Sequence, residues 1–157
     1  MSLPEPYYQD NAVTIYHGDC RDVLPELPKA DLVLTDPPYG IGKLMRGGTN
    51  TGHWNTLSGE NPWDMEAPDV TQAVAHGQHA IVWGGNYFDL PPARCVLAWR
   101  KINAVPTQAD FELAWTTLDK PAKMFSHVSG GAMRRIGHPT EKPIRLMAWC
   151  VGLADAP

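Results

Sequence analysis

Asp31-Leu32-Val33-Leu34-Thr35-Asp36-Pro37-Pro38-Tyr39 is the stretch that decides the fold of this 157-residue chain. Its first part is a short apolar run, which predicts a buried strand. A carboxylate, two prolines and an aromatic ring follow at the carboxyl end of that strand. Prolines have a fixed φ and lack an amide hydrogen, so the turn is rigid. The residues can therefore form a concave pocket that is polar and offers a stacking face, which suits a flat heteroaromatic amine.

The segments around this stretch predict an α/β fold. A strand at Ala12–Tyr16, a short helix at Arg21–Leu27 capped by Asp19, and the strand at Leu32–Thr35 make a strand–helix–strand unit. Such a unit is typical of a parallel sheet. Further strands are expected at His79–Trp83, Cys95–Trp99 and Phe111–Trp115, and further helices at Asp69–His79 and Ile144–Leu153. The Cys95–Trp99 and Phe111–Trp115 strands have no helical pattern between them, which favours an antiparallel pair.

The length and composition indicate one domain with a real core. Apolar residues make up 43% of the chain and charged residues 19%, and no apolar run has the length of a membrane span. Residues 1–11 are expected to be an N-terminal tail without a secretory signal. The cysteines, Cys20, Cys95 and Cys150, are odd in number and widely spaced, which indicates a reducing cytoplasm. Their spacing does not match a metal site, so no metal is expected.

Basic residues are concentrated in one part of the chain. Residues 1–118 hold 7 basic and 14 acidic side chains, whereas residues 119–145 hold 6 basic and 2 acidic ones. A local basic surface can bind phosphates although the net charge is -4. A solvated loop that is basic by chance is the alternative.

The chemistry predicted for the turn after Thr35 is activation of an exocyclic amine. Such an amine is a poor nucleophile because its lone pair is delocalised into the ring. Hydrogen-bond acceptors placed where positive charge develops stabilise the transition state. The Asp36 carboxylate and the Pro37 carbonyl can be the two acceptors for the hydrogens of the amine. Tyr39 supplies a face on which a base flipped out of a duplex can stack. An Asx-type turn with Tyr39 as a packing residue is the structural alternative.

Several blocks occur in one order along the chain: 17–20, 31–40, 83–88, 109–115 and 138–143. This order resembles the β-type N4/N6 amino-group DNA methyltransferases. The resemblance covers roughly residues 12–157 and implies a Rossmann-like fold with a mostly parallel sheet and an antiparallel edge pair. It also implies methyl transfer from S-adenosylmethionine to DNA, with adenine N6 favoured over cytosine N4. By the same resemblance Asp36, Pro37, Pro38 and Tyr39 form the catalytic pocket.

The resemblance also implies cofactor contacts, whereas candidate DNA contacts come from the residues of two segments. The cofactor residues it implies are Asp19, Asp36, His138, Thr140 and Lys142. Helix capping is the alternative role for Asp19, and a turn before a Pro-started helix is the alternative for residues 138–143. A mobile loop at 41–68 is expected to close over DNA or over the flipped base, and the segment 119–137 is expected to recognise the target. The candidate DNA-binding residues in these two segments are Lys43, Arg46, Lys123, Arg134 and Arg135.

One part of the family pattern is not seen. No Gly-x-Gly turn after a strand follows Leu153, so we expect the fold to be incomplete at its C-terminus or minimal. Unpaired strand edges would then favour a homo-oligomer or a complementing chain. A catalytically inactive DNA-binding remnant is the alternative function, and methylation of protein or RNA amides is a third. A bacterial or phage-type cytoplasmic protein is expected, and a role in restriction–modification or in regulation stays open.

Overall fold

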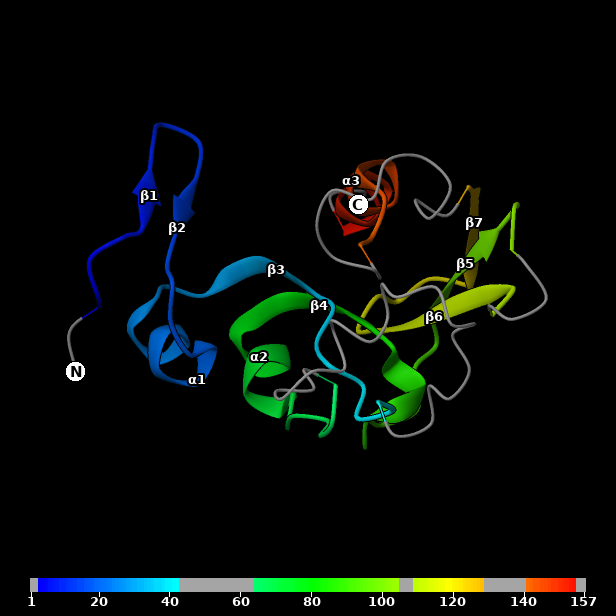
Figure 1. The fold of residues 1–157 in the computed structure, drawn as a ribbon, viewed down its shortest axis with the longest axis horizontal. Coiled ribbons are helices and arrows are strands. Elements are labelled where there is room, and N and C mark those ends of the chain that lie inside the picture. Colours follow the sequence, from blue (N-terminus) through cyan, green and yellow to red (C-terminus); the bar gives the residue numbers. More distant parts are fainter. Residues whose placement is uncertain (1–2, 43–63, 105–108, 129–140, 155–157) are drawn as a thin grey trace, which may run out of the picture.

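A five-stranded mixed sheet, in the order β3-β4-β6-β5-β7, forms the centre of the molecule (Figure 1). The structure is a computed structural model and describes residues 3–42, 64–104, 109–128 and 141–154. Two pairs of neighbours, β3 with β4 and β5 with β7, are parallel, whereas β6 is antiparallel to β4 and to β5. β6 therefore runs against the other four strands. The strands are β3 (Ala30–Thr35), β4 (Gly77–Trp83), β5 (Val96–Lys101), β6 (Phe111–Thr116) and β7 (Lys123–His127).

The predicted antiparallel pair forms as β5 and β6, but it lies inside the sheet and not at its edge. β4 covers the outer side of β6, and β7 covers the outer side of β5. No strand was expected between Trp115 and Ile144, yet Lys123–His127 is a strand. Its sequence does not alternate between apolar and polar residues, because the apolar Met124 and Phe125 are adjacent, and Lys123 and Met124 are both exposed. Backbone pairing with β5 and a tilted ring contact of 5.2 Å between Phe125 and Trp149 hold it in place. The fold is thus α/β with two parallel and two antiparallel pairings in its main sheet.

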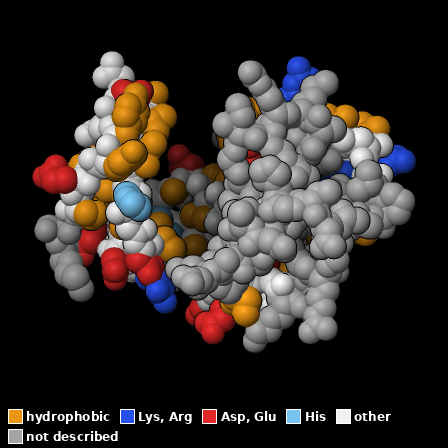
Figure 2. Space-filling view, viewed as in Figure 1, with side chains coloured by type: hydrophobic (Ala, Val, Ile, Leu, Met, Phe, Trp, Pro, Cys, Tyr) orange, Lys and Arg blue, Asp and Glu red, His pale blue; other side chains and the backbone are white. Residues whose placement is uncertain are grey.

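The N-terminal residues form a separate hairpin. β1 (Tyr8–Gln9) pairs antiparallel with β2 (Thr14–Ile15), so part of the predicted tail is a strand, and β2 does not join β3 in one sheet. The reason is local, because the Asp10 carboxylate accepts the amides of Ala12 and Val13 and closes a tight turn. Figure 2 shows apolar side chains along this hairpin, where Tyr7, Tyr8, Val13 and Ile15 are exposed.

The predicted Arg21–Leu27 helix is split into two short pieces, α1 (Cys20–Val23) and the 3-10 turn η1 (Leu24–Glu26). Pro25 lacks the amide hydrogen that a continuing helix would need, so the α-helix ends before it. The predicted cap is present, since the Asp19 carboxylate accepts the Arg21 amide at 2.9 Å. Capping of this kind satisfies an amide that has no partner within the helix.

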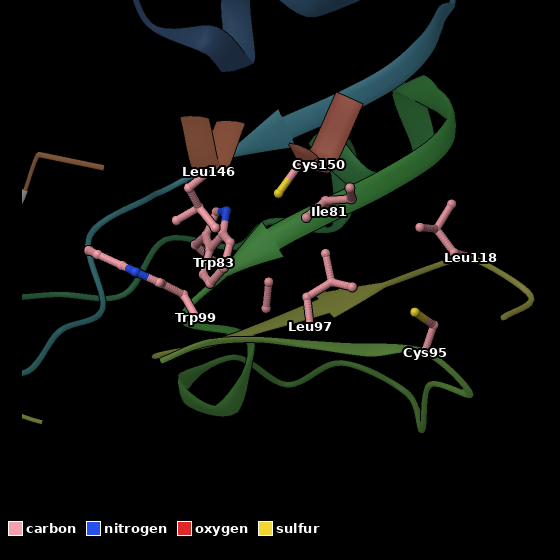
Figure 3. Packing of buried hydrophobic residues seen from close by; sticks show 9 residues of the cluster. Ile81, Trp83, Cys95, Leu97, Trp99, Leu118, Leu146 and Cys150 are labelled. Carbon is pink, nitrogen blue, oxygen red and sulfur yellow. The ribbon is translucent and has the colours of Figure 1, made fainter. Parts of the chain in front are cut away.

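The core lies between the sheet and α3 (Ile144–Ala154), the helix predicted near the C-terminus. Figure 3 shows Leu146 and Cys150 of α3 directed onto the sheet, where Ile81, Trp83 and Leu97 are fully buried. Ile81 and Trp83 of β4 belong to the core under α3, and α2 (Thr71–His76) lies on the other side of the sheet (Figure 1). Within the described ranges, no helix is long and apolar enough to span a membrane.

Candidate active site at the end of strand β3

Asp36 is the centre of a polar cluster at the carboxyl end of β3. The Tyr39 hydroxyl donates to Asp36 Oδ1 at 2.7 Å. Lys142, just before α3, donates from Nζ to both Asp36 oxygens at 2.8 Å and to the Tyr39 hydroxyl at 3.2 Å. The Lys142 side chain is 6% exposed, whereas Asp36 is 28% exposed and can be reached from outside. The tertiary fold thus brings together two catalytic candidates and one cofactor candidate that the sequence suggested separately.

Glu112 on β6 extends the cluster, and the sequence did not point to it as a site residue. Glu112 Oε1 lies 2.6 Å from Nζ of Lys101, and Oε2 lies 3.1 Å from Nζ of Lys142. The second contact is an ion pair and not a well-aligned hydrogen bond. Burial raises the pKa of Glu112, but the nearby ammonium groups of Lys142 and Lys101 outweigh burial and hold this pKa below its usual range. The four charged groups therefore alternate in sign: Lys101, Glu112, Lys142 and Asp36.

The Tyr39 ring is enclosed by aromatic residues and by a glycine. The Tyr87 ring is stacked on it at 5.1 Å and 18°, and the Phe88 ring meets it edge-on at 6.3 Å. Gly84, with φ +71°, lies so close that an added Cβ would overlap the Tyr39 ring. Burial, followed by the hydrogen bond to Asp36, raises the pKa of the Tyr39 phenol well above its usual range. Tyr39 is therefore a neutral hydrogen-bond donor at all ordinary pH values.

Asp64 anchors the turn that carries Tyr39. Its Oδ1 accepts the Tyr39 amide at 2.5 Å and the Gly40 amide at 2.8 Å, and its backbone carbonyl accepts the Gly42 amide at 2.7 Å. The residue is 4% exposed. Gly40 has φ +73°, a conformation that glycine adopts at little cost, and an added Cβ would meet the backbone of Ala67. Asp64 could not be recognised from the sequence, because it lies 25 residues after Tyr39 in a segment without periodicity.

A cavity of about 410 Å³ lies next to this aromatic cluster. Tyr87, Phe88 and Asp89 line one part of it, and residues 67–71, which lead into α2, line the rest. Because Tyr87 and Phe88 also contact Tyr39, the cavity and the Asp36 cluster share a wall. The size is within the range of small-molecule sites.

The other predicted site residues are placed as follows. Asp19 caps α1 and pairs with the Arg21 guanidinium. Hydrogen bonds from the Arg21 guanidinium and from the Arg21 amide lower the pKa of Asp19 to about 2. Lys123 is exposed at the start of β7. Pro37 and Pro38 follow Asp36 in the same turn. The candidates that lie outside the described residues are Lys43, Arg46, Arg134, Arg135, His138 and Thr140. The cofactor and DNA roles stay predictions.

Within the described ranges no metal-binding group of His, Cys, Asp and Glu occurs.

Comparison with known proteins supports a methyltransferase over part of the chain. No family model matches this sequence. A segment of 48 residues is 44% identical to the Type II methyltransferase M.ScaI of Streptomyces caespitosus. The matched segment is 29% of this chain and 16% of M.ScaI, so the similarity covers a small part of each protein.

Proposed function

We propose that this chain methylates an exocyclic amine of a DNA base, with S-adenosylmethionine as the methyl donor and adenine N6 favoured over cytosine N4. The observation that carries the proposal is the Asp36 cluster, a partly exposed carboxylate at the end of a strand beside an enclosed aromatic ring. The partial similarity to the Type II methyltransferase M.ScaI supports the reaction class. The β-type N4/N6 subgroup and the preference for adenine are parts of the proposal.

The proposed role of Asp36 is to accept a hydrogen from the target amine. That hydrogen bond increases the electron density available on the nitrogen, and it stabilises the positive charge that develops there. The Pro37 carbonyl is proposed as the second acceptor. The Tyr39 ring, fixed by Tyr87 and by the bond of its hydroxyl to Asp36, orients the base. Positioning is the main contribution of these groups to the rate.

The proposed cofactor site fits the described residues in part. S-adenosylmethionine supplies an electrophilic methyl group on a positive sulfonium when it is bound, and the partly exposed Asp36 carboxylate suits that charge. Asp19 is retained as a proposed contact near the adenosine of the cofactor. Lys142 fits less well as a cofactor contact. A lysine has three ammonium hydrogens, and hydrogen bonds to Asp36 and Tyr39 already occupy three donor directions. His138 and Thr140 are retained as proposed cofactor contacts outside the described residues.

DNA is the proposed partner, held by the basic residues of the loop 41–68 and of the segment 119–137. Lys123 lies on exposed strand β7, where a phosphate could reach it. Neutralising phosphates releases counterions, so each lost contact should lower the salt dependence of DNA binding. Arg134→Ala combined with Arg135→Ala should weaken binding and flatten its salt dependence. Identical binding across a salt series would remove these residues from the interface.

The test of the function is a methylation assay with the whole chain. Unmethylated genomic DNA would be incubated with radiolabelled S-adenosylmethionine, digested to nucleosides and separated by chromatography. N6-methyladenine is the expected product, and Asp36→Ala should lower the rate by about 100-fold or more, as loss of a preorganised transition-state contact does. Asp10→Asn, which removes the charge of an exposed carboxylate in the turn of the N-terminal hairpin, is the matched control.

Each other result decides a part of the proposal. N4-methylcytosine as the product would overturn the preference for adenine. A folded chain that binds DNA without methylating it would support the inactive DNA-binding remnant. A folded chain that neither binds nor methylates DNA would overturn the proposed function.

A further inference from the structure

The hydrogen bonds to Asp36 leave one acceptor position of its carboxylate open. A carboxylate has about four lone-pair positions. Lys142 Nζ is 2.8 Å from both oxygens, so the ammonium lies between them and takes one position on each. The Tyr39 hydroxyl takes the second position on Oδ1. Among the described residues nothing takes the second position on Oδ2, and the Asp36 side chain is 28% exposed.

The orientation of Asp36 therefore depends on where the Lys142 ammonium lies. A lysine side chain is a flexible four-carbon stem with a point charge at its end, so its position depends on the groups around the ammonium. Besides Asp36 and the Tyr39 hydroxyl, the Lys142 ammonium contacts Glu112 at 3.1 Å, and Glu112 is the contact that lies on a strand of the sheet. Lys101 holds the other Glu112 oxygen at 2.6 Å, and its ammonium also lies 5.2 Å from the Trp99 ring centre. This series of contacts runs from the rigid sheet to the carboxylate.

We propose that Glu112 is a positioning residue, which acts through Lys142 to turn Asp36 so that Oδ2 receives the hydrogen of the target amine. This inference rests on the proposed function and adds a specificity mechanism to it. A base without an amine leaves the oriented Asp36 carboxylate without a hydrogen-bond donor, which lowers the binding free energy. The site therefore selects bases that carry an amine over bases that lack one. Glu112 itself does not touch the base.

The test measures selection for the amine without requiring methyl transfer. Two single-stranded oligonucleotides with randomised flanks would carry either adenine or purine, which lacks the amine, at the central position. Binding of each to the whole chain would be followed by fluorescence anisotropy. For the wild-type chain we expect about tenfold tighter binding of the adenine strand, in line with the rejection of partners that leave a buried polar group unpaired. A second pair with cytosine and 2-pyrimidinone would report on the other amine.

Glu112→Gln keeps the shape of the side chain and removes its charge. We expect the adenine-to-purine ratio to fall to about twofold or less, with the affinity for the purine strand unchanged. A purely structural role would weaken binding of both strands equally. Lys142→Met should lower the ratio in the same way, and it serves as the test if Glu112→Gln does not fold. Asp10→Asn removes the charge of an exposed carboxylate in the turn of the N-terminal hairpin and should keep the wild-type ratio.

The outcomes separate this inference from the function on which it rests. A wild-type chain that binds both strands equally would overturn the proposed recognition of an amine, and the positioning role with it. A wild-type chain that prefers adenine, together with a folded Glu112→Gln variant of unchanged ratio, would overturn the positioning role alone. Equal loss of affinity for both strands in Glu112→Gln would also overturn it.

Discussion

Replacing Gly84 by alanine should disturb the site and the fold together. Gly84 lies at the end of β4 with φ +71°, in the left-handed region. A Cβ at this position would overlap three atoms of the Tyr39 ring. The ring cannot easily give way, because Tyr87 is stacked on it and its hydroxyl is bonded to Asp36. The alanine therefore introduces both backbone strain and a steric clash.

The expected size of the effect follows from these two costs. A residue with a side chain in the left-handed region costs about 1–2 kcal/mol. Overfilling a packed site costs about 1–3 kcal/mol. We therefore expect Gly84→Ala to lower the free energy of unfolding by roughly 3 kcal/mol, from these two principles together. In a chain of this size that corresponds to a fall in Tm of about 10 °C.

The measurement is thermal unfolding followed by circular dichroism, with Gly152→Ala as the matched control. Gly152 lies in α3, and an added Cβ there meets nothing within 4 Å. Alanine is favoured over glycine in a helix by up to about 1 kcal/mol, so this variant should melt at or slightly above the wild-type temperature. A Gly84→Ala variant that melts as high as the wild type would show that the contact between Gly84 and Tyr39 is not as described.

Three further results are expected. Leu146→Ala should lower the free energy of unfolding in urea by about 2–5 kcal/mol, because Leu146 is fully buried, and a loss below about 1 kcal/mol would contradict its core position. Burial raises the pKa of the Cys150 thiol to about 11, so a thiol reagent at neutral pH should label exposed Cys20 in the folded chain, and rapid labelling of Cys150 would contradict its burial. The pKa of Glu112 is lowered from about 4.5 in the folded chain, so its stabilising contribution is present above that value and is lost as the pH falls through the lower folded pKa. Glu112→Gln should therefore reduce the loss of stability on acidification below about pH 4.5, and an unchanged acid profile would contradict the pairing.

Local patterns were sufficient to predict most elements of the sheet and the final helix. The strand before Asp36, the strand ending at Trp83 and the helix beginning at Ile144 were all predicted from short-range periodicity, with small shifts at their ends. Strand β7 was not predicted, because its pairing with β5 depends on backbone hydrogen bonds and not on an apolar pattern. The hairpin of β1 and β2 was also missed as a separate unit, since the turn signal of Asp10 before Ala12 and Val13 was not recognised.

The sequence by itself determined which groups the site contains at one point in the chain: a carboxylate, two prolines and an aromatic ring after a buried strand. Only the tertiary structure decided that Lys142 lies on Asp36, 106 residues away, and that Glu112 holds it from the other side. The contact of the Asp64 carboxylate with the backbone amides of Tyr39 and Gly40 likewise depends on the tertiary structure. Local sequence preferences act over a few residues, whereas ion pairs and buried carboxylates depend on which strands are neighbours. That physical difference is why the groups in this stretch could be read from the sequence and their contacts with Lys142, Glu112 and Asp64 could not.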